Sequence, residues 1–162
     1  MVAHSPPSLS LAIGADHAGV AVKAALIEAL TAAGHRVTDC GTDGPASVDY
    51  PDFAQAVAAQ VTSGRASLGV LVCGTGIGMC IAANRQPGIR AAVLHSTTEA
   101  RLTRAHNDAN MACFGARISG IETILDSLQA FLATPYEGGR HDKRLRKLSA
   151  ADAALTPSEA AP

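Results

Sequence analysis

Five strand-like runs alternate with helical segments along this chain, and that alternation limits its fold more than any other feature. The strand-like runs are residues 9–13, 35–40, 68–72, 89–94 and 110–114. Apolar residues at helical spacing, or a helix-start signal, mark segments 20–33, 51–61, 79–84, 96–106 and 121–132. Run 68–72 has no polar position, as in a strand buried on both faces. The alternation predicts an α/β fold: a doubly wound parallel five-stranded sheet with helices on both faces, a Rossmann-like three-layer sandwich.

The chain is expected to form a single domain. Its 162 residues are enough to bury a core without disulfides or metals. Residues 9–149 form the predicted domain, which ends in a short basic helix over 140–148 as a C-terminal helical extension. Residues 1–8 are predicted to be a disordered N-terminal tail, and residues 150–162 a frayed C-terminal tail.

Charge and aromatic content exclude several functional classes. Thirteen Lys and Arg balance fourteen Asp and Glu, and aromatic residues make up 3% with no Trp. This composition argues against nucleic acid or an anionic membrane surface as a partner. The uncharged stretch 66–84 contains four glycines, so we interpret it as strand, turn and helix rather than a membrane span. The start lacks the charged and apolar regions of a signal peptide, and the four cysteines lack a secreted pattern, so a cytoplasmic protein is expected.

The turn at residues 73–78 (CGTGIG) is the sharpest local motif. Glycines at alternate positions let the backbone approach a ligand and direct its N–H groups inward at the start of a helix, which favours an anion or oxyanion. No Gly-Lys-Ser/Thr follows, so it is not a P-loop, and Met79 replaces the third glycine of a dinucleotide fingerprint. The alternative is a tight turn that needs glycine for steric reasons alone.

Cys73 stands where this strand meets the turn, close to a helix N-terminus. The field of a helix N-terminus favours a thiolate, which can act as a base or nucleophile. The alternative is a small buried core residue, which is the commoner fate of cysteine. Cys80 is expected in the core, and Cys40 and Cys113 are given no role.

Two further polar segments contain groups able to take part in chemistry. Asp16 and His17 follow the first strand and therefore belong at the ligand edge of a parallel sheet, unless they are simply solvated. His106 and Asn107 end a helix, where they could equally serve as a dipole partner and a cap. No histidine pair or cysteine spacing resembles a zinc site, so no metal is expected.

Arginines near the C-terminus are candidates for an anion site. Arg140 and Arg144 share a face if residues 140–148 are helical, and such a fork suits a phosphate. Arg117 follows the fifth strand and could join the same phosphate. The alternative is a solvated basic helix.

Six motifs in order carry a resemblance to a known family. They are residues 14–19 (GADHAG), 49–51 (DYP), 73–78 with 81–84 (CGTGIG and IAAN), 106–108 (HND), 114–117 (FGAR) and 136–141 (YEGGRH). With these motifs the chain resembles the ribose-5-phosphate isomerase B family, which includes the galactose-6-phosphate isomerase subunits. The resemblance covers residues 9–148. One branch of the family has a Glu base just after the turn; Met79 stands there in this chain, which therefore resembles the cysteine branch.

The resemblance implies a cofactor-free aldose–ketose isomerase of the pentose phosphate pathway. It would interconvert D-ribose 5-phosphate and D-ribulose 5-phosphate through an enediolate. Cys73 would then be the base that moves the proton between C1 and C2, and His106 would open the furanose ring. Asp16 would hold a sugar hydroxyl, with Asn107 nearby.

The resemblance also assigns the remaining site residues and an assembly. The turn would stabilise the enediolate oxygen through Gly74, Thr75, Gly76, Ile77 and Gly78. The phosphate would be held by His17, Arg117, Arg140 and Arg144, and Tyr50 would line the pocket. Family members form homodimers with shared active sites, some of which pair into tetramers.

Three alternatives remain open at this point. The substrate could be another sugar phosphate, namely allose 6-phosphate, galactose 6-phosphate or a tetrose 4-phosphate. A non-catalytic sugar-phosphate sensor would keep Arg140 and Arg144 but would not need Cys73 or His106. A dinucleotide-dependent oxidoreductase would need an acidic residue at the end of the second strand, where the predicted boundary places Cys40.

Overall fold

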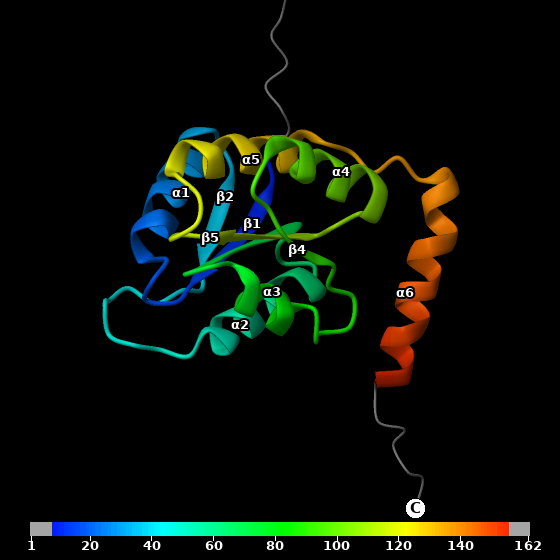
Figure 1. Cartoon of the computed structure of the whole chain (residues 1–162), viewed down its shortest axis with the longest axis horizontal. Helices are drawn as coiled ribbons and strands as arrows, with labels where there is room; N and C mark the ends of the chain where they lie inside the picture. Colours follow the sequence, from blue (N-terminus) through cyan, green and yellow to red (C-terminus); the bar gives the residue numbers. More distant parts are fainter. Residues whose placement is uncertain (1–7, 156–162) are drawn as a thin grey trace, which may run out of the picture.

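The computed structural model describes residues 8–155 and folds them into a three-layer α/β sandwich (Figure 1). Its five strands are all parallel and stand in the order β2-β1-β3-β5-β4. The strands are β1 (Ser10–Ala15), β2 (Arg36–Asp39), β3 (Leu68–Cys73), β4 (Ala91–Val93) and β5 (Met111–Gly115). The predicted fold class is confirmed.

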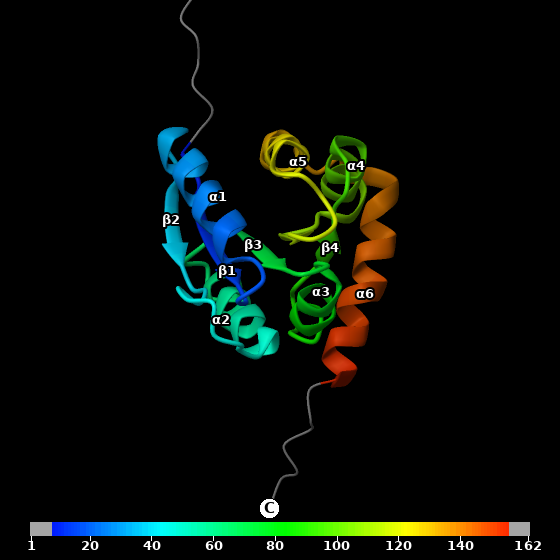
Figure 2. The same ribbon diagram turned by 60° about the vertical axis from the view of Figure 1, so that its left-hand side comes forward.

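Helices cover both faces of the sheet (Figure 2). One face carries α1 (Val20–Ala32), α4 (Thr97–Asn107) and α5 (Ile121–Ala133), and the other carries α2 (Tyr50–Thr62) and α3 (Ile77–Ala83). Phe114 and Phe131 are fully buried in the first layer, as are Leu71 and Met79 in the second. Met79 is thus a core residue, and its side chain fills the interior beneath the Gly-rich turn.

The strand order reverses between β1 and β3. The chain runs from β1 to β2 through α1 on one face and returns to β3 through α2 on the other face. Ligands of doubly wound sheets bind at such a reversal, beyond the carboxyl ends of the strands. Ala15 pairs with Val72 at these ends, so Asp16 and Cys73 follow directly at the same edge.

The register also fixes what lies at the opposite edge. Met111, the first residue of β5, pairs with Gly69, and Gly115 pairs with Cys73. Four residue steps separate these pairs, so the amino and carboxyl edges are about 13 Å apart along the strands. The end of α4 leads into β5 and therefore lies at the amino edge, whereas Cys73 lies at the carboxyl edge.

Local signals in the sequence explain two helix ends. The Ser96 hydroxyl accepts a hydrogen bond from the Glu99 N–H and so caps α4 at the first residue of the predicted segment 96–106, and the Glu99 carboxylate accepts one from the His95 N–H. Gly34 follows α1 with φ +86°, and its N–H donates to the Thr31 carbonyl. A glycine is favoured there because a side chain opposes that left-handed conformation.

Several predicted element boundaries differ from the observed ones, and three of these differences bear on the site or on the alternatives for it. The C-terminal helix α6 (Asp142–Leu155) runs well past the expected end at residue 148, so part of the predicted frayed tail is helical. Arg140 lies before it, in the 3-10 turn η1 (Gly139–His141). Strand β2 ends at the acidic Asp39 rather than at Cys40, but the Asp39 carboxylate is paired with the buried Lys23 ammonium at 2.6 Å.

Helix α6 lies outside the sandwich, beside the layer edge formed by α3 and α4 (Figures 1 and 2). A pocket separates α6 from the body, lined by Leu148 and Ser149 on one side and by Arg90 and Asn107 on the other. Among residues 8–155, no helix is both long and apolar enough to cross a membrane. Of the predicted tails at residues 1–8 and 150–162, the parts 1–7 and 156–162 lie outside the described residues.

Candidate active site

The Gly-rich turn between β3 and α3 holds the Cys73 sulfur in a backbone cradle. The Gly76 N–H donates a hydrogen bond to Cys73 Sγ across 3.1 Å. Gly76 has φ +79°, and a Cβ at this position would lie 2.9 Å from the Phe114 backbone. Cys73 itself is 4% exposed. The Gly76 N–H thus fixes the position of the Cys73 sulfur at the end of β3.

The loop after β5 closes over the same turn. The Ala116 N–H donates to the Cys73 carbonyl at 2.8 Å, and the Arg117 N–H donates to the Gly74 carbonyl at 3.0 Å. The Arg117 side chain lies against Gly74, since a Cβ there would be 3.5 Å from Arg117 Nη1. The exposed Thr75 accepts a hydrogen bond from the Ile77 N–H through its hydroxyl. A positive charge and a hydroxyl thus flank the backbone N–H groups of the turn.

The first βα loop brings a carboxylate and an imidazole to this edge. Asp16 is 7% exposed, its N–H donates to the Val72 carbonyl, and its carboxylate accepts from the Ala18 N–H. His17 Nδ1 accepts from the Val48 N–H at 3.3 Å, which ties the loop between β2 and α2 to the first loop. Both side chains are therefore held in place at the carboxyl edge.

Tyr50 completes the group at the carboxyl edge. It is the first residue of α2, and its ring packs against Gly78, where a Cβ would come within 2.8 Å of Tyr50 Cζ. A side chain at residue 78 would have to displace the Tyr50 ring. We call Asp16, His17, Tyr50, the turn 73–78 and Arg117 the carboxyl-edge group.

The other predicted site residues form a second group at the opposite edge. His106 and Asn107 end α4, Arg140 lies in η1, and Arg144 lies in the first turns of α6. We call these four residues, with Glu137 and His141, the amino-edge group. Arg117 lies at the carboxyl edge, so within one chain it is separated from Arg140 and Arg144.

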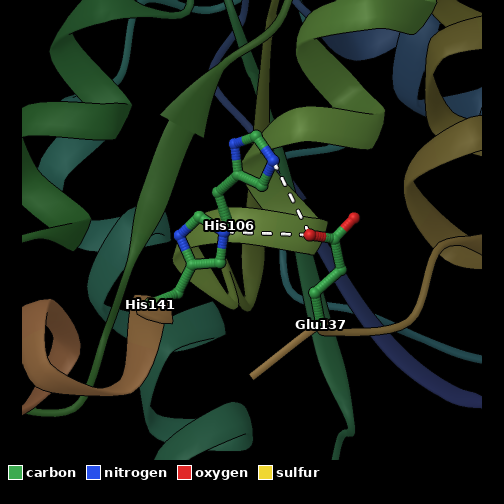
Figure 3. Close-up of side chains that lie close together, drawn as sticks. All are labelled: His106, Glu137 and His141. Atoms are coloured by element: carbon green, nitrogen blue, oxygen red, sulfur yellow. Dashed lines mark ion pairs between the residues drawn. The ribbon is translucent and has the colours of Figure 1, made fainter. Parts of the chain in front are cut away.

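Two members of the amino-edge group were missed by sequence reasoning. The His141 ring is 5% exposed and stacks on the His106 ring, with centroids 4.4 Å apart and planes 13° from parallel. Glu137 Oε2 lies 3.9 Å from His106 Nε2 and 3.7 Å from His141 Nε2 (Figure 3). The three residues come from separate segments, so motif spacing alone does not reveal them. The only sequence signal is the motif 136–141, which contains two of them.

The linker before α6 is fastened to α4, which fixes this cluster. The Glu137 N–H donates to the Ala105 carbonyl at 3.0 Å. The Tyr136 hydroxyl donates to the Asp142 carboxylate at 2.8 Å, and burial together with Asp142 raises the pKa of Tyr136 to about 12. Gly138 and Gly139 both have positive φ, which lets the chain turn into α6.

The cluster offers a cation three ligand atoms within 4.8 Å of one another: one from His106, one from Glu137 and one from His141. Arg140 opposes that use, because its Nε donates a hydrogen bond to His141 Nε2 at 3.3 Å. A guanidinium therefore occupies the lone pair that a metal would need, and its charge repels a cation. The surroundings of the cluster suit an anion better.

The remaining cysteines, Cys40, Cys80 and Cys113, lie outside the Gly-rich turn 73–78. Cys80 on α3 donates to the Ala91 carbonyl at 3.4 Å, and its hydrogen bond with Cys113 lowers the pKa of Cys80 to about 7. That hydrogen bond and complete burial raise the pKa of Cys113. Burial also raises the pKa of Cys40, helped by the nearby Asp39 carboxylate. All four cysteines are reduced.

Comparisons with known proteins show which family the chain belongs to. The Ribose/Galactose Isomerase family model matches residues 11–148. Ribose-5-phosphate isomerase B of Escherichia coli K12 is 41% identical over 140 residues, 86% of this chain and 94% of that protein. The D-erythrulose-4-phosphate isomerase of Pectobacterium atrosepticum is 40% identical over 142 residues, covering 86% of this chain and 93% of that protein.

A solved structure of Clostridium thermocellum ribose-5-phosphate isomerase B superposes with a TM-score of 0.90 at 42% identity. It covers 91% of this chain and 100% of the other. The fold, the order of the motifs and the sequence identity over nearly the full length all point to the same family. Together they confirm the resemblance that the six motifs indicate. The chain is an isomerase of the ribose/galactose isomerase family.

Proposed function

We propose that this protein is a cofactor-free aldose–ketose isomerase that interconverts D-ribose 5-phosphate and D-ribulose 5-phosphate. The observation that carries the proposal is the Cys73 sulfur under the Gly76 N–H at the end of β3. A non-catalytic sugar-phosphate sensor has no need for a thiol held in this way. One relative is named for a pentose phosphate and another for a tetrose phosphate. These relatives therefore support isomerisation of a sugar phosphate more strongly than they support any one sugar.

The proposed reaction is a proton transfer between C2 and C1 of the open-chain aldose. The Cys73 thiolate takes the proton from C2, and the electron pair forms the C1–C2 double bond while charge moves onto the C1 carbonyl oxygen. The O2 hydroxyl proton shifts to O1, and the Cys73 thiol returns its proton to C1, which leaves the carbonyl at C2. Backbone N–H groups of the turn, with Thr75, stabilise the negative oxygen as it develops.

Asp16 and Arg117 are placed to hold the rest of the sugar phosphate. Asp16 already accepts from Ala18, and its second carboxylate oxygen is assigned to a sugar hydroxyl. Arg117 beside Gly74 is assigned to the phosphate, with His17, and Tyr50 lines the pocket. His106 is assigned the ring opening, with Asn107 beside it, and Arg140 and Arg144 complete the phosphate contacts.

These assignments require two copies of the chain. Cys73 must touch C1 and C2, and His106 must touch the ring oxygen bonded to C1, so the two side chains have to come within about 8 Å at reactive contact distances. Within one chain they stand at opposite edges, about 13 Å apart along the strands alone, and in different helical layers. We therefore propose a homodimer in which the carboxyl-edge group of one copy meets the amino-edge group of the other.

The surface near the turn fits a second copy. Ile77 and Ile81 lie one helical turn apart on α3, and each is 55% exposed. Apolar side chains gathered beside a site mark surfaces that bury themselves against a partner. Pairing of such dimers into tetramers is compatible with this surface.

A substrate screen tests the proposed function. Without added cofactor, the protein is expected to convert ribose 5-phosphate to ribulose 5-phosphate with a higher kcat/KM than for allose 6-phosphate, galactose 6-phosphate or erythrose 4-phosphate. A higher kcat/KM for one of the other three sugar phosphates would make that compound the substrate and would leave the proposed reaction class unchanged. Binding of all four without turnover would make the protein a sensor.

A further inference from the structure

The stack of His141 on His106 is the most constrained feature that the proposed reaction does not yet use. His141 lies beneath the His106 ring at the start of α6, and Glu137 reaches both rings from the linker (Figure 3). The Glu137 N–H bond to the Ala105 carbonyl holds the linker to α4, and the Tyr136–Asp142 hydrogen bond holds the start of α6 to the linker. The second imidazole is therefore buried, oriented and in direct contact with the residue assigned to ring opening.

The hydrogen bond from Arg140 decides the protonation state of the His141 ring. A guanidinium can only donate, so the Arg140 Nε contact makes His141 Nε2 an acceptor, and His141 is the neutral ring. Burial, His106, Arg140 and Arg144 all lower the pKa of His141, against a smaller opposing effect of Glu137. The Glu137 carboxylate lies beside both rings, 3.9 Å from His106 Nε2 and 3.7 Å from His141 Nε2. A neutral ring beneath His106 supports it without repelling a proton on it.

We propose that His141, together with Glu137, is a positioning residue that holds the His106 imidazole for opening of the sugar ring. The inference rests on the proposed function, because it assigns His141 a part in a step of that reaction. In this step the C1–O4 bond breaks, O4 takes a proton from His106, and the anomeric hydroxyl gives its proton to solvent water as the C1 carbonyl forms. Solvent then returns a proton to His106, so the step is balanced without a further reactant.

The step can be measured apart from isomerisation. Ring opening and closure exchange the α and β anomers of ribose 5-phosphate, and this exchange is visible by NMR with substrate labelled at C1. A Cys73→Ser background blocks proton transfer at carbon while keeping an acceptor for the Gly76 N–H. In that background His106 still opens the ring, so the protein is expected to accelerate anomer exchange over buffer.

Adding His141→Ala to Cys73→Ser should reduce the acceleration of anomer exchange over the buffer rate by at least about tenfold, because a misplaced general acid loses most of its effect. His141→Phe keeps a ring for stacking and should recover part of the exchange. His95→Ala serves as the matched control, since His95 lies at the far end of α4 and pairs only with Glu99 among the described residues. Thermal unfolding of each variant checks that the fold persists.

The inference is overturned if Cys73→Ser with His141→Ala exchanges anomers as fast as Cys73→Ser alone. It is also overturned if Cys73→Ser does not accelerate exchange, because His106 then does not open the ring. Loss of exchange on adding EDTA, with recovery on Zn²⁺, would overturn it as well by making the cluster a metal site. None of these results touches turnover of ribose 5-phosphate by the parent protein, on which the proposed function depends.

Discussion

The Gly76 N–H points at Cys73 Sγ across 3.1 Å, and a side chain at residue 76 is excluded by the Phe114 backbone. The sequence of the turn, the positive φ of Gly76 and the position of the thiol are thus parts of one construction. The proposed isomerisation depends on this arrangement of turn and thiol.

Replacement of Cys73 should remove isomerisation and spare binding. Cys73→Ala and Cys73→Ser are both expected to lower kcat by at least about 10³-fold, because neither side chain supplies a base for a proton on carbon. Ligand-induced thermal shift by ribose 5-phosphate should persist in both. The control is Cys80→Ser, which removes a thiol on the neighbouring helix α3 and should keep most activity. A Cys73→Ala protein with near parental kcat would place the base elsewhere.

Substitution of Gly76 should cost both stability and activity. Gly76→Ala is expected to lower the free energy of unfolding by about 2–4 kcal/mol, since it combines a strained φ with a close backbone contact. Gly64→Ala is the matched control, because Gly64 also has positive φ but a Cβ there meets nothing within 4 Å. Its loss should be about 1 kcal/mol. Urea unfolding of both variants measures the difference, and equal losses would mean that the Phe114 contact yields easily.

Removal of Arg144 should raise KM for the sugar phosphate with little change in kcat. A phosphate contact holds ground state and transition state alike, and loss of one charge-assisted hydrogen bond corresponds to about a tenfold rise in KM. Arg101→Ala, an exposed arginine on α4, should leave KM unchanged. Steady-state kinetics of the two variants decide the matter; an Arg144→Ala enzyme with the parental KM would remove α6 from the site.

The rates of alkylation of Cys80 and Cys40 should depend differently on pH. The pKa of Cys80 is lowered to about 7 by its hydrogen bond with Cys113, whereas that of Cys40 is raised by burial. The thiolate is the reactive form, so alkylation of Cys80 should rise as pH increases through 7 and level off, while Cys40 continues to gain above 9. Mass spectrometry after short iodoacetamide pulses gives both profiles. An inflection for Cys80 at pH 9 or above would contradict the Cys113 contact.

The alternation of strands and helices, the glycine turn and the Ser96 cap could be predicted because each depends on residues close in sequence. The separation of Cys73 from His106 along the strands could not, since it depends on the pairing of Met111 with Gly69 and of Gly115 with Cys73. No local pattern reports register across the sheet. The same reason hides the contact between His106 and His141, which joins separate helices.

The extension of α6 to Leu155 was missed although its sequence contained a signal. Residues 150–155 (AADAAL) are rich in alanine, the strongest helix former, and lack glycine and proline. Arg140 was assigned to the same helix because its charge matched the basic run 143–147, whereas the two preceding glycines with positive φ place it in η1.

Complementation between two inactive variants tests most directly that the active site is built from two copies. Cys73→Ser and His106→Asn, each nearly inactive alone on ribose 5-phosphate, are unfolded, mixed in equal amounts and refolded together. If Cys73 of one copy works with His106 of the other, each mixed dimer has one intact site, and the mixture should regain about a quarter of the parental activity. A mixture no more active than the two separate variants would show that both residues act within one chain and would contradict the shared site.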